Sequence, residues 1–288
     1  MTDKFEIIVI GYRWFWQTLE RTIDSILRTN KHNLRVNVGL NSPEPEMLAM
    51  LEKYRRRLNI VEVSNLNLNK VGMQRRLVHL CTAKYIISFD DDSFVIHKDW
   101  QDFLIQRIES YENKTLRYFG DFGEEKEAKF RQMTGNTVGI LGLICYAWLD
   151  EPKRKILAKC PWYDPVNKLN HNGFNRQYNK EQIWYVAGGF YAFLREPYLK
   201  FDYPGFDYRM AYEDTILSFF YQHHGYRIGD FGEGFDDSGL DNKGGYAAFG
   251  NRLIVNAGQR TYDIESVESK EHSLDVRACE QFYGNEYL

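Results

Sequence analysis

The stretch that decides the fold of this chain reads Tyr85-Ile86-Ile87-Ser88-Phe89-Asp90-Asp91-Asp92. Its apolar half is typical of a buried strand, and three carboxylates follow at the strand's carboxyl end. Such a concentration of negative charge is tolerated only where a cation neutralises it. Mg²⁺ or Mn²⁺, held by one or two carboxylates and by substrate phosphates, would suit this site. An acidic turn at a strand end is the alternative interpretation.

Strand and helix patterns alternate around this stretch. Apolar runs predict strands over residues 5–10, 34–40, 59–63 and 84–89, and helical spacing predicts helices over 16–28, 44–57 and 72–82. This alternation is typical of βαβ units, in which helices cover both faces of a parallel sheet. Ligands bind such sheets at the carboxyl ends of the strands, where the three acids lie. The sequence therefore predicts an α/β fold with its site at that edge.

The second half of the chain is less regular. Residues 139–146 and 184–194 predict further strands, with a polar loop over 159–182 between them. An apolar stretch over 216–221 follows an acidic pair and predicts a helix. Residues 229–258 are rich in glycine and aspartate and predict a long loop, which in a compact domain is more often functional than ornamental.

Composition indicates a globular protein with a sizeable core, because 43% of the 288 residues are apolar and 16% aromatic. The net charge of −3 gives no global field that would attract nucleic acid or an anionic membrane. We expect reduced cysteines and a cytoplasmic protein that is neither secreted nor membrane-spanning. The reasons are four cysteines without a C-x-x-C pair, no signal-peptide core, and no window of eighteen apolar residues.

Six short segments, in order, resemble family 2 glycosyltransferases of the GT-A fold. They are residues 8–12, 38–42, 69–72, 87–92, 186–190 and 212–214. The resemblance implies a Rossmann-like nucleotide-diphospho-sugar transferase with a mostly parallel central sheet. It implies a catalytic domain over 1–228, with a nucleotide-sugar-binding half (1–98) and an acceptor-binding half (99–228), and an extension over 229–288 packed on the same domain.

The resemblance maps the family's metal-binding DxD motif onto Asp90 and Asp92. Asp92 is expected to bind Mn²⁺ or Mg²⁺ directly, and Asp90 to contact the ribose or a metal-bound water. Asp91 points the other way along the strand, so we expect it to tolerate replacement best. Many relatives add a histidine ligand after the last helix, where this chain has Asp236 and Asp237; Asp237 is our candidate third ligand. Weaker alternatives are His223, His224 and His272.

The acidic pair Glu213-Asp214 is the candidate catalytic group. An acceptor hydroxyl must lose its proton as it attacks the anomeric carbon, which needs a carboxylate within about 3 Å. In the family an acidic pair at a helix start supplies this base, which implies Asp214 as base and Glu213 as an acceptor contact. Acids in the first turn of a helix are also favoured by capping and by the helix dipole, so a purely structural role is the alternative.

A glycine pair, Gly188-Gly189, is expected to let the backbone approach the sugar-diphosphate closely, since glycine lacks a Cβ; a bulge in the strand is the competing explanation. Lys70 and the pair Arg75-Arg76 lie just before the acidic strand. They could neutralise phosphate or orient donor hydroxyls, and a solvated helix face is expected for at least one of them.

Two strand ends are expected to bind the nucleobase by resemblance, namely Tyr12 and Asn41. The family usually places an acid near the second strand end to bind uracil, whereas this chain has Gly39, Leu40 and Asn41 there. Uridine is therefore one of several candidate nucleosides.

Together these features predict an inverting, metal-dependent glycosyltransferase that moves a sugar from a nucleotide-diphosphate donor to a hydroxyl. A glycan or cell-surface polymer is the expected acceptor, and a hydroxylated base in DNA is the alternative. A nucleotidyltransferase and a catalytically silent carbohydrate- or nucleotide-binding module are the rival classes. The sequence does not determine the oligomeric state.

Overall fold

The computed structural model describes the parts of the chain that carry most of the predicted site. These are residues 4–13, 15–95, 98–112, 137–149, 154–155, 157–163, 174–175, 180–201, 213–230, 247–249 and 254–256. Three proposed alternative metal ligands, Asp236, Asp237 and His272, lie outside the described residues.

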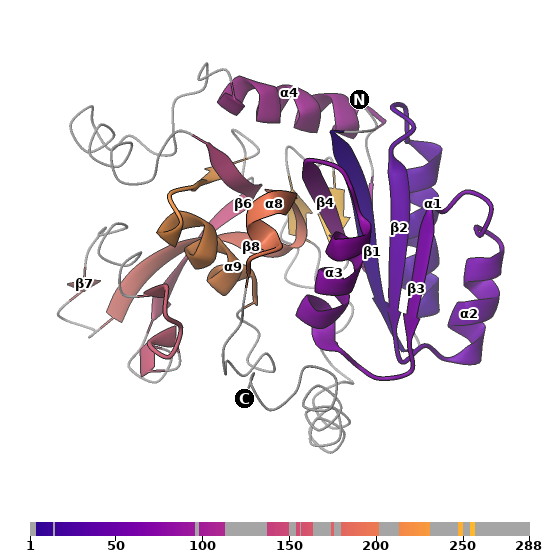
Figure 1. The fold of residues 1–288 in the computed structure, drawn as a ribbon, viewed down its shortest axis with the longest axis horizontal. Helices are drawn as coiled ribbons and strands as arrows, with labels where there is room; N and C mark the ends of the chain where they lie inside the picture. Colours follow the sequence, from indigo (N-terminus) through magenta and orange to yellow (C-terminus); the bar gives the residue numbers. More distant parts are fainter. Residues whose placement is uncertain are drawn as a thin grey trace.

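A mixed sheet runs through the molecule in the order β3-β2-β1-β4-β8-β6-β9, with β7 paired to β8 (Figure 1). Its parallel part consists of β1 (Phe5–Tyr12), β2 (Arg35–Asn41), β3 (Ile60–Ser64) and β4 (Tyr85–Asp90). The rest consists of β6 (Val138–Leu149), β7 (Phe174–Asn175), β8 (Lys180–Leu194) and β9 (Arg227–Asp230). β8 is antiparallel to β4 and β6, and β6 is parallel to β9. The predicted α/β fold with a mostly parallel sheet is confirmed.

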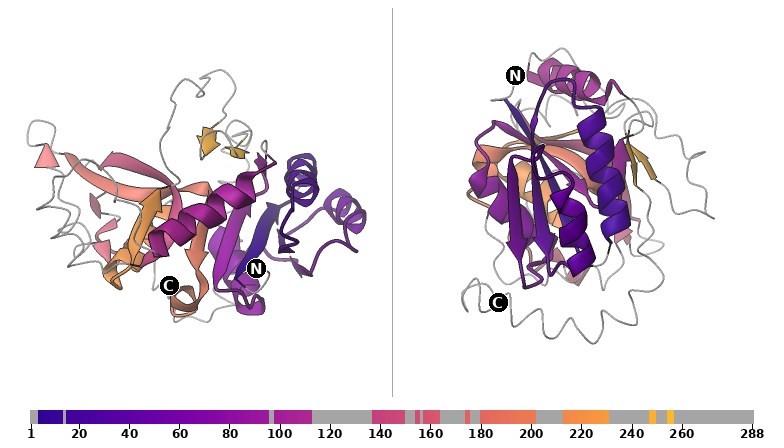
Figure 2. Two further views of the ribbon diagram at one scale, coloured as in Figure 1. Left: turned by 90° about the horizontal axis from the view of Figure 1, so that it is seen from above. Right: turned by 90° about the vertical axis from the view of Figure 1, so that its right-hand side faces the viewer.

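Helices cover both faces of this sheet, as the βαβ pattern predicted. Helix α1 (Trp16–Arg28), which packs against α2 (Pro45–Glu52), and helix α3 (Asn69–Leu80) lie on opposite faces (Figure 2). The core forms because β1 and β4 are apolar on both faces, and Ile7, Val9 and Ile87 are fully buried. The second half adds α4 (Trp100–Glu112), α8 (Arg195–Tyr198) and α9 (Glu213–His223). None of the helices described here is long and apolar enough to cross a membrane.

Several boundaries differ from the prediction. Helix α2 ends at Glu52 instead of residue 57, and α3 begins at Asn69 instead of residue 72. Helix α4 was not predicted, and β8 begins inside the predicted loop over 159–182. The predicted loop over 229–258 contains β10 (Ala247–Phe249) and β11 (Ile254–Asn256), which form a small antiparallel sheet with β5 (Ser93–Val95).

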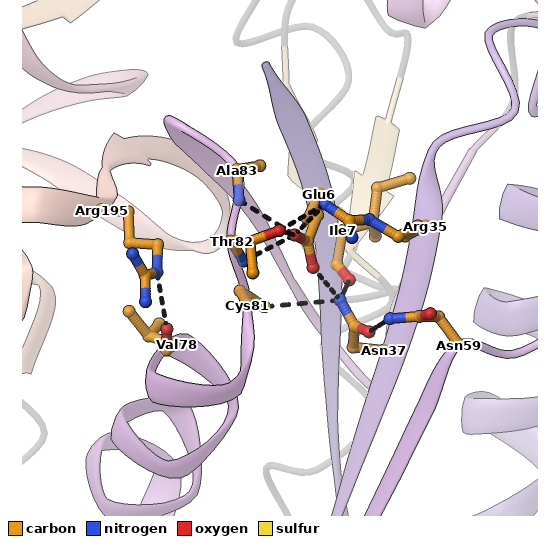
Figure 3. A network of polar contacts seen from close by, with 10 residues as sticks. All are labelled: Glu6, Ile7, Arg35, Asn37, Asn59, Val78, Cys81, Thr82, Ala83 and Arg195. Carbon is orange, nitrogen blue, oxygen red and sulfur yellow. Dashed lines mark hydrogen bonds and ion pairs between the residues drawn. The ribbon is translucent and has the colours of Figure 1, made fainter. Parts of the chain in front are cut away.

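A buried carboxylate, Glu6, joins the amino-terminal ends of the central strands (Figure 3). It is 1% exposed, and its Oε1 accepts hydrogen bonds from the backbone N–H groups of Thr82 (2.7 Å) and Ala83 (2.9 Å). The same oxygen pairs with the guanidinium of Arg35 at 2.6 Å, and Oε2 accepts from Asn37 Nδ2 at 3.0 Å. Burial alone would raise the pKa of Glu6, but these donors outweigh it and lower the pKa. This network stabilises the sheet at the end opposite the predicted site.

Candidate functional site

The three consecutive acids end β4 at the carboxyl edge of the sheet, and their environments differ. The side chain of Asp90 is 17% exposed, whereas Asp91 and Asp92 are 0% and 5% exposed. Asp91 Oδ2 accepts a hydrogen bond from the backbone N–H of Tyr12 at 3.1 Å, so it ties the end of β1 to the end of β4. This contact argues against the expectation that Asp91 tolerates replacement best, because a partly buried amide would lose its acceptor; the expectation itself stays a prediction.

Lys70 connects the two acidic segments that the sequence singled out. Its Nζ lies 2.8 Å from Asp90 Oδ1 and 3.6 Å from Glu213 Oε1. Burial lowers the pKa of Lys70, but the negative charges around it, Asp90 foremost, outweigh burial and raise the pKa well above its ordinary value. The ammonium is therefore charged and holds α3, β4 and α9 together at the sheet edge.

Asn41 places Lys70. Its side chain is 2% exposed; Nδ2 donates to the carbonyl of Asn69 at 3.1 Å, and Oδ1 accepts from the backbone N–H of Leu68 at 3.1 Å. Asn69 has a φ of 57°, a left-handed conformation that asparagine adopts more readily than most residues. Asn41 therefore fixes the first turn of α3. Its expected contact with the nucleobase stays a prediction.

Asp214, in the first turn of α9, is a partly buried acid whose pKa is raised. Its Oδ2 accepts from the backbone N–H of Gly188 at 2.7 Å, and its Oδ1 from that of Thr215 at 2.6 Å. Burial and the neighbouring charge of Glu213 raise the pKa of Asp214 to about 7, against the opposing effects of Lys70 and the two amides. A carboxyl group that exchanges its proton near neutral pH has the property required of a general base.

The glycine pair lies in a bulge of β8. The register between β6 and β8 passes from Gly142↔Tyr191 to Ile144↔Val186, so β8 has extra residues here. Gly189 has a φ of 86°, where a side chain would be strained. A Cβ on Gly188 would lie 3.4 Å from both Asp214 Oδ2 and Lys70 Nζ. The bulge is thus present, and it turns the N–H of Gly188 toward Asp214.

The remaining predicted residues lie at the end of β1 (Tyr12) and on helix α3 (Arg75 and Arg76). Tyr12 ends β1 beside Asn41 in register, and the guanidinium of Arg13 lies 5.2 Å from the centre of its ring. Arg76 pairs with Glu62 on β3 at 2.9 Å, which matches the solvated helix face expected for one of the basic residues. Arg75 lies half-buried on the same helix.

The two histidines at the end of α9 lie away from the acids. His223 and His224 are exposed, and the helix places His223 about 15 Å from Glu213. This position excludes His223 as a ligand beside Asp90.

One pair in the site was not found by sequence reasoning. Tyr191 and Gln74 are buried under Lys70: Gln74 Nε2 donates to Tyr191 Oη at 2.9 Å, and Lys70 Nζ lies 5.4 Å from the centre of the Tyr191 ring. Burial raises the pKa of Tyr191 to about 12, so its hydroxyl stays neutral. The only sequence signal was a tyrosine two residues after the glycine pair.

The fit of a metal ion depends on the acids of β4. Within the described ranges no group of three or more Asp, Glu, His or Cys side chains is arranged to hold a metal. Mg²⁺ and Mn²⁺ nevertheless require only one or two protein carboxylates when substrate phosphates complete the shell. Asp90, partly exposed at the strand end, meets that chemical requirement, with its Oδ1 on the ammonium of Lys70. Asp90 is therefore a suitable carboxylate for a phosphate-bridged ion, whose presence stays a proposal.

Solved structures with a similar arrangement share little sequence with this chain. TarS from S. aureus is 19% identical with a TM-score of 0.34, covering 38% of this chain and 20% of that one. Mannosyltransferase PcManGT from Pyrobaculum calidifontis, solved with GDP-Man and Mn²⁺, is 14% identical with a TM-score of 0.45, covering 78% and 54%. The bifunctional IspDF from Campylobacter jejuni is 9% identical with a TM-score of 0.40, covering 81% and 50%. This chain thus spans about half or less of each, and with such TM-scores none of them decides the family.

The sequence itself does decide it. No curated protein matches the chain. Residues 6–199, well over half of the chain, match the sequence model of the family described as glycosyl transferase family 2. The matched region includes the acids of β4, Lys70 and the glycine pair, and it confirms the resemblance. The chain belongs to glycosyl transferase family 2.

Proposed function

We propose that this protein transfers a sugar from a nucleotide-diphosphate donor to a hydroxyl acceptor with inversion at the anomeric carbon. The observation that carries the proposal is Asp214, a partly buried acid whose pKa is raised to about 7, at the edge of the sheet where α/β folds bind ligands. A first-turn acid that served only as a helix cap would gain from keeping its charge, and its pKa would be low.

In the proposed reaction Asp214 accepts the proton of the acceptor hydroxyl while the hydroxyl oxygen bonds to the anomeric carbon. The bond from that carbon to the diphosphate breaks in the same displacement, so no covalent intermediate forms. The amides of Gly188 and Thr215 orient the carboxylate. Glu213 lies beside it and is our candidate for the acceptor contact.

The leaving diphosphate gains negative charge as the bond breaks and needs positive charge nearby. Lys70 supplies one ammonium at the site. A divalent ion held by Asp90 and Asp92, with Asp237 as a third ligand, would add Lewis-acid stabilisation of the diphosphate. Tyr12 and Arg75 remain our candidates for donor contacts.

The acceptor we propose is a glycan or cell-surface polymer. The compartment we propose for the enzyme is the cytoplasm. The net charge of −3 disfavours DNA as the alternative acceptor. The family assignment disfavours a nucleotidyltransferase, and the raised pKa of Asp214 argues against a silent binding module, which needs no base.

Release of nucleoside diphosphate from a panel of nucleotide sugars, with and without Mn²⁺, tests this function. We expect Asp214→Asn to lose about 10²- to 10⁴-fold in turnover, the range that general-base catalysis contributes. Glu46→Gln is the matched control, because Glu46 is also an acid in the first turn of a helix but lies exposed on α2. Equal activity of wild type and Asp214→Asn would refute the assignment of the base.

A further inference from the structure

Lys70 is more than a donor contact in this site. We infer that its ammonium is a built-in competitor of the divalent ion for Asp90: it occupies the carboxylate in the resting site and must leave Asp90 Oδ1 when the ion binds. This inference rests on the metal-assisted transfer proposed above, and it concerns how strongly the site binds the ion.

The first support is the geometry of one atom. Lys70 Nζ lies 2.8 Å from Asp90 Oδ1 and 3.6 Å from Glu213 Oε1. The position of a Cβ on Gly188 is 3.4 Å from both this nitrogen and Asp214 Oδ2, so a third carboxylate is close by. The ammonium of Lys70 therefore neutralises carboxylates of both β4 and α9. We expect the divalent ion to neutralise Asp90 in the same way.

The second support is that the two cations would share one carboxylate. Mg²⁺ binds carboxylate oxygens at about 2.0–2.1 Å, and an ammonium at 2.8 Å from that oxygen would then lie within about 5 Å of the ion. Like charges at this separation repel strongly in a partly buried site, and the side chains of Lys70 and Asp90 are only 18% and 17% exposed. This repulsion favours release of the ammonium from Asp90 Oδ1 when the ion binds.

The third support is that the side chain can move while its backbone cannot. Asn41 holds the start of α3 through Leu68 and Asn69, so the helix is fixed. The four-carbon stem of lysine is flexible and ends in a point charge that needs no fixed direction of approach. The ammonium can therefore leave Asp90 while the start of α3 stays in place.

The alternative is that Lys70 is a structural ion pair and nothing more. In that case its removal would leave the site less ordered, and the affinity for a divalent ion would stay the same or fall. Competition predicts instead that the affinity for the divalent ion rises when Lys70 is removed. The direction of the change in metal affinity therefore separates the two explanations.

The test is direct titration of the intact protein with Mn²⁺ alone, following free Mn²⁺ by electron paramagnetic resonance. We expect Lys70→Met to bind Mn²⁺ at least about tenfold more tightly than wild type, because a positive charge beside the site has been removed. Lys70→Arg, which keeps the charge, should stay within about threefold of wild type. Arg76→Met is the matched control on the same helix, since Arg76 pairs with Glu62 outside the site, and should bind as wild type does.

Unchanged or weaker Mn²⁺ binding by Lys70→Met, or no Mn²⁺ binding by any of the proteins, would overturn the inference. If Lys70→Met does not fold, as judged by thermal denaturation, Lys70→Gln takes its place with the same expected result. Nucleotide release by wild type is measured separately. Tighter binding by Lys70→Met without any release would overturn the proposed function and leave the inference standing, and release with unchanged Mn²⁺ affinity would do the reverse.

Discussion

The two ends of the central sheet shift the pKa of a carboxyl group in opposite directions. At the amino-terminal end, Glu6 is surrounded by donors from Arg35, Asn37, Thr82 and Ala83, and its pKa is lowered (Figure 3). At the carboxyl-terminal end, Asp214 accepts two backbone hydrogen bonds, yet burial and Glu213 raise its pKa to about 7. One end is organised to keep a charge, and the other to exchange a proton.

This difference supports the proposed location of the active site at the carboxyl-terminal end of the sheet. The charge of Glu6 stabilises the native state at neutral pH, and the stabilisation is lost as the pH falls through the ordinary value for glutamate toward its lower native pKa. Ionisation of Asp214 has the opposite effect. It lowers the stability of the native state as the pH rises from the ordinary pKa of aspartate to about 7. A protein retains such a cost where function requires it.

Replacing Glu6 should have the largest effect on stability. Glu6→Ala leaves two backbone amides and Arg35 without their acceptor, and we expect a loss of about 3–5 kcal/mol in the free energy of unfolding. Chemical denaturation measures this change. Turnover per folded molecule should stay near that of wild type, because the network is at the opposite end of the sheet. A stable Glu6→Ala protein with lost turnover would break the comparison.

Gly189→Ala should have a smaller effect on stability and a clear effect on the site. The φ of 86° at Gly189 strains any other residue, at a cost of about 1–2 kcal/mol in the free energy of unfolding. Because the bulge also aims the amide of Gly188 at Asp214, we expect the KM for the donor to change less than kcat does. Chemical denaturation and steady-state kinetics measure the two effects. Gly225→Ala, at a φ of 81° in the turn after α9, is the matched control and should lose stability alone.

Sequence reasoning predicted the first half of the fold well because each strand and helix there has its own apolar period. It extended α2 to residue 57, although the helix stops at Glu52, because a single face of apolar residues continues through Tyr54. It missed α4, whose buried residues Trp100, Leu104 and Ile108 were spaced as a helix requires. Strands β10 and β11 span three residues each, too few to show a period, and depend on distant pairing with β5.

The sequence predicted residues of the candidate site, but not the contacts between them. Motif order brought Asp90, Gly188 and Asp214 forward as candidates, and the structure places Gly188 against Asp214. The ion pairs of Lys70 join segments far apart in the chain, so no local pattern reports them. Strand alternation pointed Asp91 away from its neighbours, but it did not show that this side is buried.

The pH dependence of kcat/KM for nucleoside diphosphate release tests the central claim most directly, because it reports the ionisation of the free enzyme's base. Since only the ionised carboxylate of Asp214 can accept a proton, activity should rise about tenfold per pH unit in acid and level off above a midpoint near 7. A profile that stays level down to the ordinary range of a carboxyl group, about pH 4, would contradict the account.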